Sequence, residues 1–113
     1  MAKSIDAGKI VTLEAITSVA RTLGAPAPSQ VTLAMARELL EGITVVPDSE
    51  ALSELRFILE RLKLLTEPAA SCTLAAAEHL RGHFSPDRHV VLLLCGGNMG
   101  LDDLARLMLS QPQ

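Results

Sequence analysis

The residues of this chain that could do chemistry stand in a short run of small side chains, Cys95-Gly96-Gly97-Asn98, which we call the elbow. A thiol and an amide flank two glycines there, and glycine lets the backbone turn sharply and approach a ligand closely. The elbow follows the uninterrupted apolar segment 90–94, which is typical of a strand buried on both faces, as in a parallel α/β sheet. Because ligands in open α/β sheets bind at the carboxyl ends of strands, the pattern predicts a ligand-contacting turn.

The two glycines of the elbow also permit a second interpretation, a cradle for a phosphate. Such a cradle would lie at the start of the helix expected from Leu101, where backbone N–H groups and the helix dipole attract anions. The loop contains no Lys, Ser or Thr, however, and Asp102 and Asp103 place negative charge where an anion would sit. We therefore expect a tight turn. Cys95 remains open between a ligand-facing thiol and a small hydrophobic residue at the end of a strand.

Three histidines, His79, His83 and His89, lie close enough in sequence to suggest a metal site. No cysteine or carboxylate completes an obvious set of ligands around them, and Gly82 is expected to end the helix that would carry the first two. We therefore expect solvent-facing histidines and no metal ligand in this chain.

The elements that must position the elbow are mostly helical. Capping residues, prolines and apolar periodicity predict helices over residues 30–41, about 49–65, 67–81 and 101–110. Ser29 caps the first of these, Asp48 or Ser49 the second, and Thr66 the third, whose body is nearly all small side chains and should be a central, buried helix. Short strands are expected over 43–46 and 90–94, paired in parallel through a right-handed crossover. The fold class is thus α/β, a small layered domain with a two- to three-stranded parallel sheet packed by helices.

Composition narrows the classes of partner. At 113 residues the chain is one domain at most, and with 10 basic and 13 acidic residues it has no positive field for nucleic acid. Its first residues lack the apolar core of an export signal, and no apolar run approaches the roughly 18 residues of a membrane span. Cys72 and Cys95 are far apart within apolar runs, which suits two buried, reduced thiols and a cytoplasmic protein. A hydrophobic content of 49% favours a homo-oligomer or another partner that covers apolar surface.

Two segments of the chain, 64–71 with the Ala-rich helix that follows and 90–101 with the elbow, resemble the C-terminal part of pyridoxal-phosphate-dependent serine/threonine dehydratases. These are fold-type II enzymes close to the serine racemases. The likeness extends to segments 18–24 and 43–48 and so covers nearly the whole chain. It implies that residues 1–113 are a single partial domain, the C-terminal portion of a dehydratase-like large domain.

The resemblance also implies roles for residues of the elbow. In that family a Ser or Cys before the two glycines hydrogen-bonds the pyridine nitrogen of pyridoxal phosphate, and this role falls on Cys95. A neutral partner at that nitrogen suits β-elimination of a hydroxyl group. Gly96, Gly97 and Asn98 would shape the ring pocket, and Glu67 would lie near it.

Other parts of the family pattern have no counterpart in this sequence. The Schiff-base lysine stands in a Ser-x-Lys-x-Arg-Gly setting, whereas Lys3, Lys9 and Lys63 stand in unrelated contexts. The Gly-rich phosphate loop and the substrate-carboxylate loop are missing as well. We therefore expect no catalytic residue here, and neither turnover nor stable cofactor binding by this chain alone. Three hypotheses follow: a separate C-terminal segment of a dehydratase, a segment that completes a dehydratase or racemase with another chain, and a non-enzymatic homo-oligomeric module.

Overall fold

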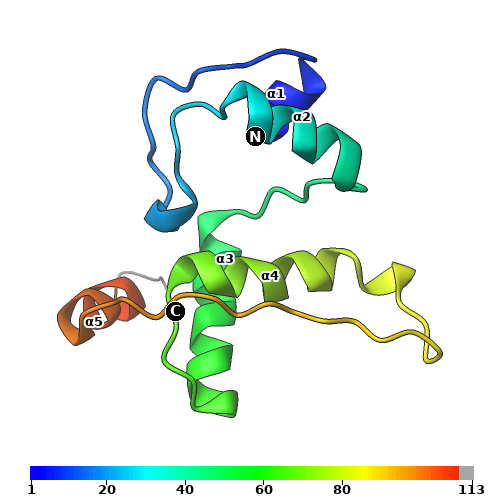
Figure 1. The fold of residues 1–113 in the computed structure, drawn as a ribbon. Helices are drawn as coiled ribbons and strands as arrows, with labels where there is room; N and C mark the ends of the chain where they lie inside the picture. Colours follow the sequence, from blue (N-terminus) through cyan, green and yellow to red (C-terminus); the bar gives the residue numbers. More distant parts are fainter. Residues whose placement is uncertain (110–113) are drawn as a thin grey trace. The chain divides into compact units, whose positions relative to one another are not determined.

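The computed structural model describes residues 1–109, which divide into two compact units, Met1–Val45 and the described residues from Val46 onward. The first unit contains the short helix α1 (Ala2–Asp6), the 3-10 turn η1 (Arg21–Leu23) and the helix α2 (Gln30–Leu39) (Figure 1). Ser29 caps α2 as the sequence predicts, because its hydroxyl accepts a hydrogen bond of 3.0 Å from the backbone N–H of Thr32. Within this unit α1 and α2 contact each other, and Leu33 and Ala36 form the buried face of α2.

The second unit holds the longer helices. Helix α3 (Asp48–Phe57) continues into a π-helical turn, η2 (Ile58–Leu62), which ends where Lys63 adopts a left-handed conformation with φ 58°. Helix α4 (Pro68–His79) is followed by the 3-10 turn η3 (Arg81–His83), and α5 (Leu101–Leu109) ends the described part of the chain. The helices expected from the sequence are therefore confirmed to within a few residues, and residue 110 of the last one lies outside the described residues.

Two of the expected helix caps are wrong. Pro47 precedes the first helical residue of α3, so neither Asp48 nor Ser49 occupies the capping position. Glu67 rather than Thr66 precedes α4, and Pro68 is its first residue, where a missing backbone N–H costs nothing. The Thr66 side chain is turned to a different partner, described below.

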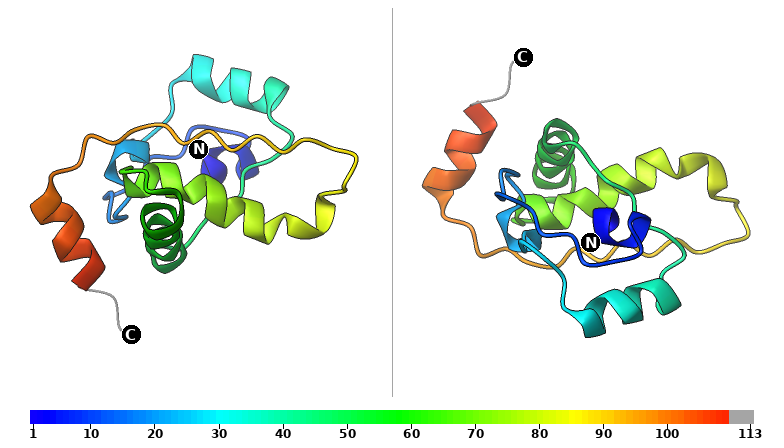
Figure 2. Two further views of the ribbon diagram at one scale, coloured as in Figure 1. Left: turned by 90° about the horizontal axis from the view of Figure 1, so that it is seen from below. Right: turned by 90° about the horizontal axis from the view of Figure 1, so that it is seen from above.

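The core of the second unit lies where α3 crosses α4 (Figures 1 and 2). The first turns of α4 are buried, as the run of small side chains predicts, and Ser71 Oγ lies 2.5 Å from the carbonyl oxygen of Ala51 in α3. Small residues let the two backbones approach closely, and the larger side chains of α3 fill the remaining space. The buried residues of the two helices and η2 are Ala51, Leu52, Leu55, Ile58, Pro68, Ala69, Ala70, Ser71 and Ala75.

The expected parallel sheet is not formed, because residues 1–109 contain no strand. Segments 43–46 and 90–94 have no regular secondary structure, and no backbone hydrogen bond of the described chain involves residues 89–95. A strand is stabilised by the neighbour with which it shares a hydrogen-bond ladder, and neither segment forms such a ladder in the described residues. The apolar pattern of segment 90–94 thus favours a strand, but the segment forms no strand within residues 1–109.

Segment 90–94 is also exposed rather than buried, which corrects the expectation of a strand covered on both faces. The exposed fraction is 86% for Val91 and 70% for Leu93, so side chains of this segment meet solvent. None of the helices in residues 1–109 is long and apolar enough to cross a membrane.

Candidate functional site

The elbow is fixed to the start of α4 by hydrogen bonds to a single carbonyl group. After η3 the chain turns and runs back along α4 without a helix (Figures 1 and 2), so that the elbow reaches the residues just before Pro68. The Thr66 hydroxyl donates a 2.6 Å hydrogen bond to the Gly96 carbonyl oxygen, and the Glu67 backbone N–H approaches the same oxygen at 3.4 Å. Both donor residues are buried, with exposed fractions of 4% for Thr66 and 8% for Glu67.

The two glycines of the elbow leave the space that this close approach uses. Gly96 has a φ of +87°, and a Cβ atom added there would lie 2.5 Å from Glu67 Oε1. A Cβ atom on Gly97 would lie 3.0 Å from the carbonyl oxygen of Leu65. A side chain at Gly96 would therefore meet both an unfavourable backbone conformation and a buried carboxylate.

The two polar side chains of the elbow face solvent. Cys95 is an exposed free thiol and Asn98 is exposed as well, so the alternative of a buried small hydrophobic residue at position 95 is wrong. The loop after them is short, because the Met99 N–H donates a 2.8 Å hydrogen bond to the Gly97 carbonyl oxygen. The arrangement presents a thiol and an amide on a turn whose backbone is hydrogen-bonded to Thr66 and Glu67 through the Gly96 carbonyl oxygen.

Cys72, in contrast, belongs to the packing of α4. It is a half-buried free thiol whose Sγ donates a 3.3 Å hydrogen bond to the carbonyl oxygen of Pro68. Burial raises the pKa of this thiol, and the negative charge of Asp48 raises that pKa further. The thiolate form is thereby disfavoured, which makes Cys72 a poor nucleophile.

The histidines do not form a metal site within the described residues, where no group of three His, Cys, Asp or Glu side chains has suitable geometry. His79, near the end of α4, instead contacts the carboxylate of Glu50 near the start of α3. These residues are 29 positions apart, and neither lies in a motif, so sequence reasoning could not pair them. Their contact links the two helices of the core.

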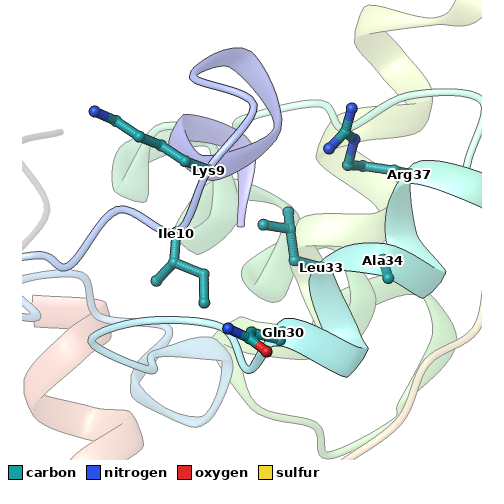
Figure 3. Close-up of a pocket in the computed structure, with 6 residues that line it drawn as sticks. All are labelled: Lys9, Ile10, Gln30, Leu33, Ala34 and Arg37. Carbon is teal, nitrogen blue, oxygen red and sulfur yellow. The ribbon is translucent and has the colours of Figure 1, made fainter.

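A separate pocket lies within the first unit, between the segment after α1 and helix α2 (Figure 3). It has a volume of about 390 Å³, with Ile10, Leu33 and Ala34 on its apolar side. Lys9, Arg37 and Gln30 supply its polar groups, and neither cation takes part in an ion pair of the described chain. None of the elbow residues lines this pocket, so its features do not bear on the chemistry of the elbow.

Comparison with known proteins supplies the class of protein to which this site belongs. Residues 1–96 match the model of the pyridoxal-phosphate dependent enzyme family. The chain is 40% identical over 100 residues to the serine dehydratase-like protein of Rattus norvegicus, a match that covers 81% of this chain and 30% of that protein. It is 36% identical over 113 residues to the L-serine dehydratase/L-threonine deaminase of Bos taurus, covering 92% of this chain and 35% of the relative.

Solved structures give the same result. A fungal L-serine ammonia-lyase from Rhizomucor miehei superposes with a TM-score of 0.80 at 27% sequence identity, over 96% of this chain and 36% of the lyase. The chain therefore belongs to the family of pyridoxal-phosphate dependent enzymes and shares the fold of part of a fold-type II enzyme. It spans about a third of the length of the relatives it matches.

The elbow residues fit one edge of pyridoxal phosphate, the cofactor of this family. The Cys95 thiol is small and exposed and can donate a hydrogen bond to a pyridine nitrogen, and the bare glycine backbone leaves room for a flat ring. The reactive-carbonyl and phosphate edges of the cofactor have no matching residues in the elbow. Thr66, which sequence reasoning assigned to a helix cap, is the residue that it missed at this site.

Proposed function

We propose that this chain is the C-terminal part of a pyridoxal-phosphate-dependent serine/threonine ammonia-lyase, and that its elbow forms the wall of the cofactor pocket beside the pyridine nitrogen. The observation that carries the proposal is the seating of the elbow on Thr66 and Glu67 in a chain of this family. Residues 1–113 then constitute one partial domain, with no catalytic residue of their own. The Schiff-base lysine and the phosphate loop come from a further segment, either of the same polypeptide or of another chain.

Within that site the residues of this chain bind and orient. Cys95 would donate its S–H to the ring nitrogen, Gly96 and Gly97 would allow the ring to lie close to the backbone, and Asn98 with Glu67 would border the pocket. Bound pyridoxal phosphate supplies the electron sink for the reaction. A thiol is a weak, neutral donor, so it leaves the ring nitrogen largely unprotonated, which is sufficient for elimination of a β-hydroxyl group.

The exposed segment 90–94 supports the part of the proposal that requires further chain. We propose that this segment becomes a strand of a parallel sheet when the remainder of the domain is present. Its backbone groups have no hydrogen-bond partners among residues 1–109, and its side chains are all apolar. Such a segment is suited to a position with a strand at each edge and helices on both faces.

Self-association is a second candidate function, favoured by the same exposed apolar surface. Large apolar side chains exposed by more than two thirds include Val45, Val91, Leu93, Leu101 and Leu109. A homo-oligomer would cover part of this surface in a subunit interface. Sedimentation over a range of concentrations tests this candidate, and a monomer at every concentration would eliminate it.

The proposed function is tested by completing the domain. The segment of the rat serine dehydratase-like protein that this chain does not match is purified and mixed with the chain and pyridoxal phosphate. We expect an absorbance band of protein-bound cofactor that appears only in the mixture. Cys95→Ala should alter the pH dependence of that band, whereas Cys95→Ser, which keeps a neutral donor, should largely preserve it. A band that is the same in all three mixtures would show that Cys95 does not contact the ring.

A further inference from the structure

We propose that Thr66 is the positioning residue of the elbow, holding its backbone in the shape that receives the cofactor ring; this inference rests on the proposed function for the role of the elbow. Thr66 would not touch the ring. Its hydroxyl acts through the Gly96 carbonyl group, at a distance of 2.6 Å.

The group that Thr66 holds is the part of the elbow with the most conformational freedom. The carbonyl of Gly96 belongs to the peptide bond between the two glycines, so this peptide plane has a glycine on either side and can rotate more freely than any other in the elbow. A hydrogen bond to its oxygen fixes the plane. The Cys95 thiol on one side and the Asn98 amide on the other are then set at one separation and in one orientation.

The hydroxyl of Thr66 is the stronger of the two donors that reach this oxygen. The Glu67 N–H lies at 3.4 Å, beyond the usual range of a backbone hydrogen bond, whereas the Thr66 hydroxyl lies at the short end of its range. Because Thr66 is 4% exposed, water has little access to replace the hydroxyl. Thr66 is also β-branched, so few rotamers are available and the hydroxyl is already directed toward Gly96.

A wall that is fixed before the ring arrives binds it more tightly than one that must be ordered on binding. The hydroxyl does this without placing a charge near the pyridine nitrogen. Valine at this position would fill the same volume and leave the Gly96 carbonyl without its close donor.

The test measures hydrogen exchange of single backbone amides in the purified 113-residue chain without cofactor. Two amides report on the elbow, because the Glu67 N–H donates to the Gly96 oxygen and the Met99 N–H donates to the Gly97 oxygen. Thr66→Val should speed exchange at both amides about fivefold, the factor expected for loss of one hydrogen bond. Amides in the middle of α4 should exchange at the rate of the unmodified chain.

Two further variants make the result specific. Thr66→Ser keeps the hydroxyl and should restore slow exchange at both reporters. Thr73→Val is the matched control, because Thr73 also donates its hydroxyl to a carbonyl, that of Ala70 at 2.8 Å, but within α4 and away from the elbow. It should leave Glu67 and Met99 unchanged.

Three results would overturn the inference: unchanged exchange in Thr66→Val, an equal effect of Thr73→Val, or a uniform rise along α4 that Thr66→Ser does not reverse. If Thr66→Val does not fold, Thr66→Ser and Thr66→Ala carry the same comparison, since only the former keeps the donor. The exchange measurement needs no cofactor and so stands apart from the proposed function. Selective exchange in the elbow together with no cofactor band in the completed domain would refute the proposed function alone.

Discussion

Substitution of Gly96 by alanine tests most sharply whether the elbow is seated on Glu67. The backbone φ of +87° is unfavourable for a residue with a side chain, which costs about 1–3 kcal/mol. The new Cβ atom would also lie 2.5 Å from Glu67 Oε1, and forcing an extra carbon into a packed site costs about 1–3 kcal/mol more. Glu67 is a buried residue, with an exposed fraction of 8%. We therefore expect Gly96→Ala to destabilise the seated elbow by about 2–6 kcal/mol.

The loss of stability is measured separately for the elbow and for the whole chain, because the elbow can detach before the helices unfold. Exchange at the Glu67 and Met99 amides should rise at least about 30-fold, the factor that corresponds to about 2 kcal/mol. Urea unfolding is followed by circular dichroism, since the chain contains no Trp or Tyr for fluorescence. We expect α3 and α4 to lose less stability than the elbow does, because local detachment relieves the strain.

Gly82→Ala is the matched control, since no atom lies within 4 Å of a Cβ at that position. It should leave the elbow amides unchanged. The double variant Gly96→Ala with Glu67→Ala separates the two contributions, because it removes the clash and keeps the unfavourable φ. Exchange in Gly96→Ala no faster than in Gly82→Ala would refute the seating of the elbow.

The two thiols and one carboxylate give further predictions. Thiol titration should show a fast phase from exposed Cys95 and a slow phase from Cys72, whose pKa is raised by burial. Glu54→Gln should stabilise the chain by about 0.3 kcal/mol at neutral pH, because partial burial and the nearby charges of Glu78 and Glu50 raise the pKa of Glu54. A raised pKa means that ionisation opposes folding, so the gain should be present above the folded-state pKa and should vanish as the pH falls below about 4.5. Thermal unfolding at both pH values measures the difference.

Each of these predictions has a control variant whose effect can be stated in advance. Cys95→Ser should remove the fast thiol phase alone, and a fast phase that survives would contradict the exposure of Cys95. Glu60→Gln should act oppositely to Glu54→Gln, because the hydrogen bond from Arg56 lowers the pKa of Glu60 and that pair stabilises the helix at neutral pH. If Glu54→Gln has the same effect in acid as at neutral pH, ionisation of Glu54 is not its cause.

The helices of this fold could be predicted from the sequence because they depend on neighbours three or four positions apart. Ser29 and Pro68 mark helix starts by local chemistry, and the structure places α2 and α4 where these residues indicate. Segment 90–94 could not be predicted in the same way, because a strand exists only with a partner, and the sequence pattern cannot say whether the partner is in the same chain. The expected burial of Cys95 failed for the same reason.

The candidate site could be proposed from the sequence as a set of residue types, but its contacts could not be predicted. The composition of the elbow indicated a turn that can approach a ligand, and the resemblance to a family implied that this ligand is pyridoxal phosphate. The hydrogen bond from Thr66 to Gly96 joins residues 30 positions apart, and the local pattern before Pro68 favoured a helix cap instead. The contact between Glu50 and His79 was hidden likewise, because only the crossing of α3 and α4 brings these side chains together.

We propose that this chain supplies one wall of a pyridoxal-phosphate site and depends on a further segment for the rest. The most direct measurement is formation of pyruvate from L-serine and of 2-oxobutyrate from L-threonine, with pyridoxal phosphate present. It compares the chain alone, the unmatched segment of the rat serine dehydratase-like protein alone, and their mixture. We expect product from the mixture only. Turnover by the chain alone, or a mixture no more active than the added segment, would contradict it.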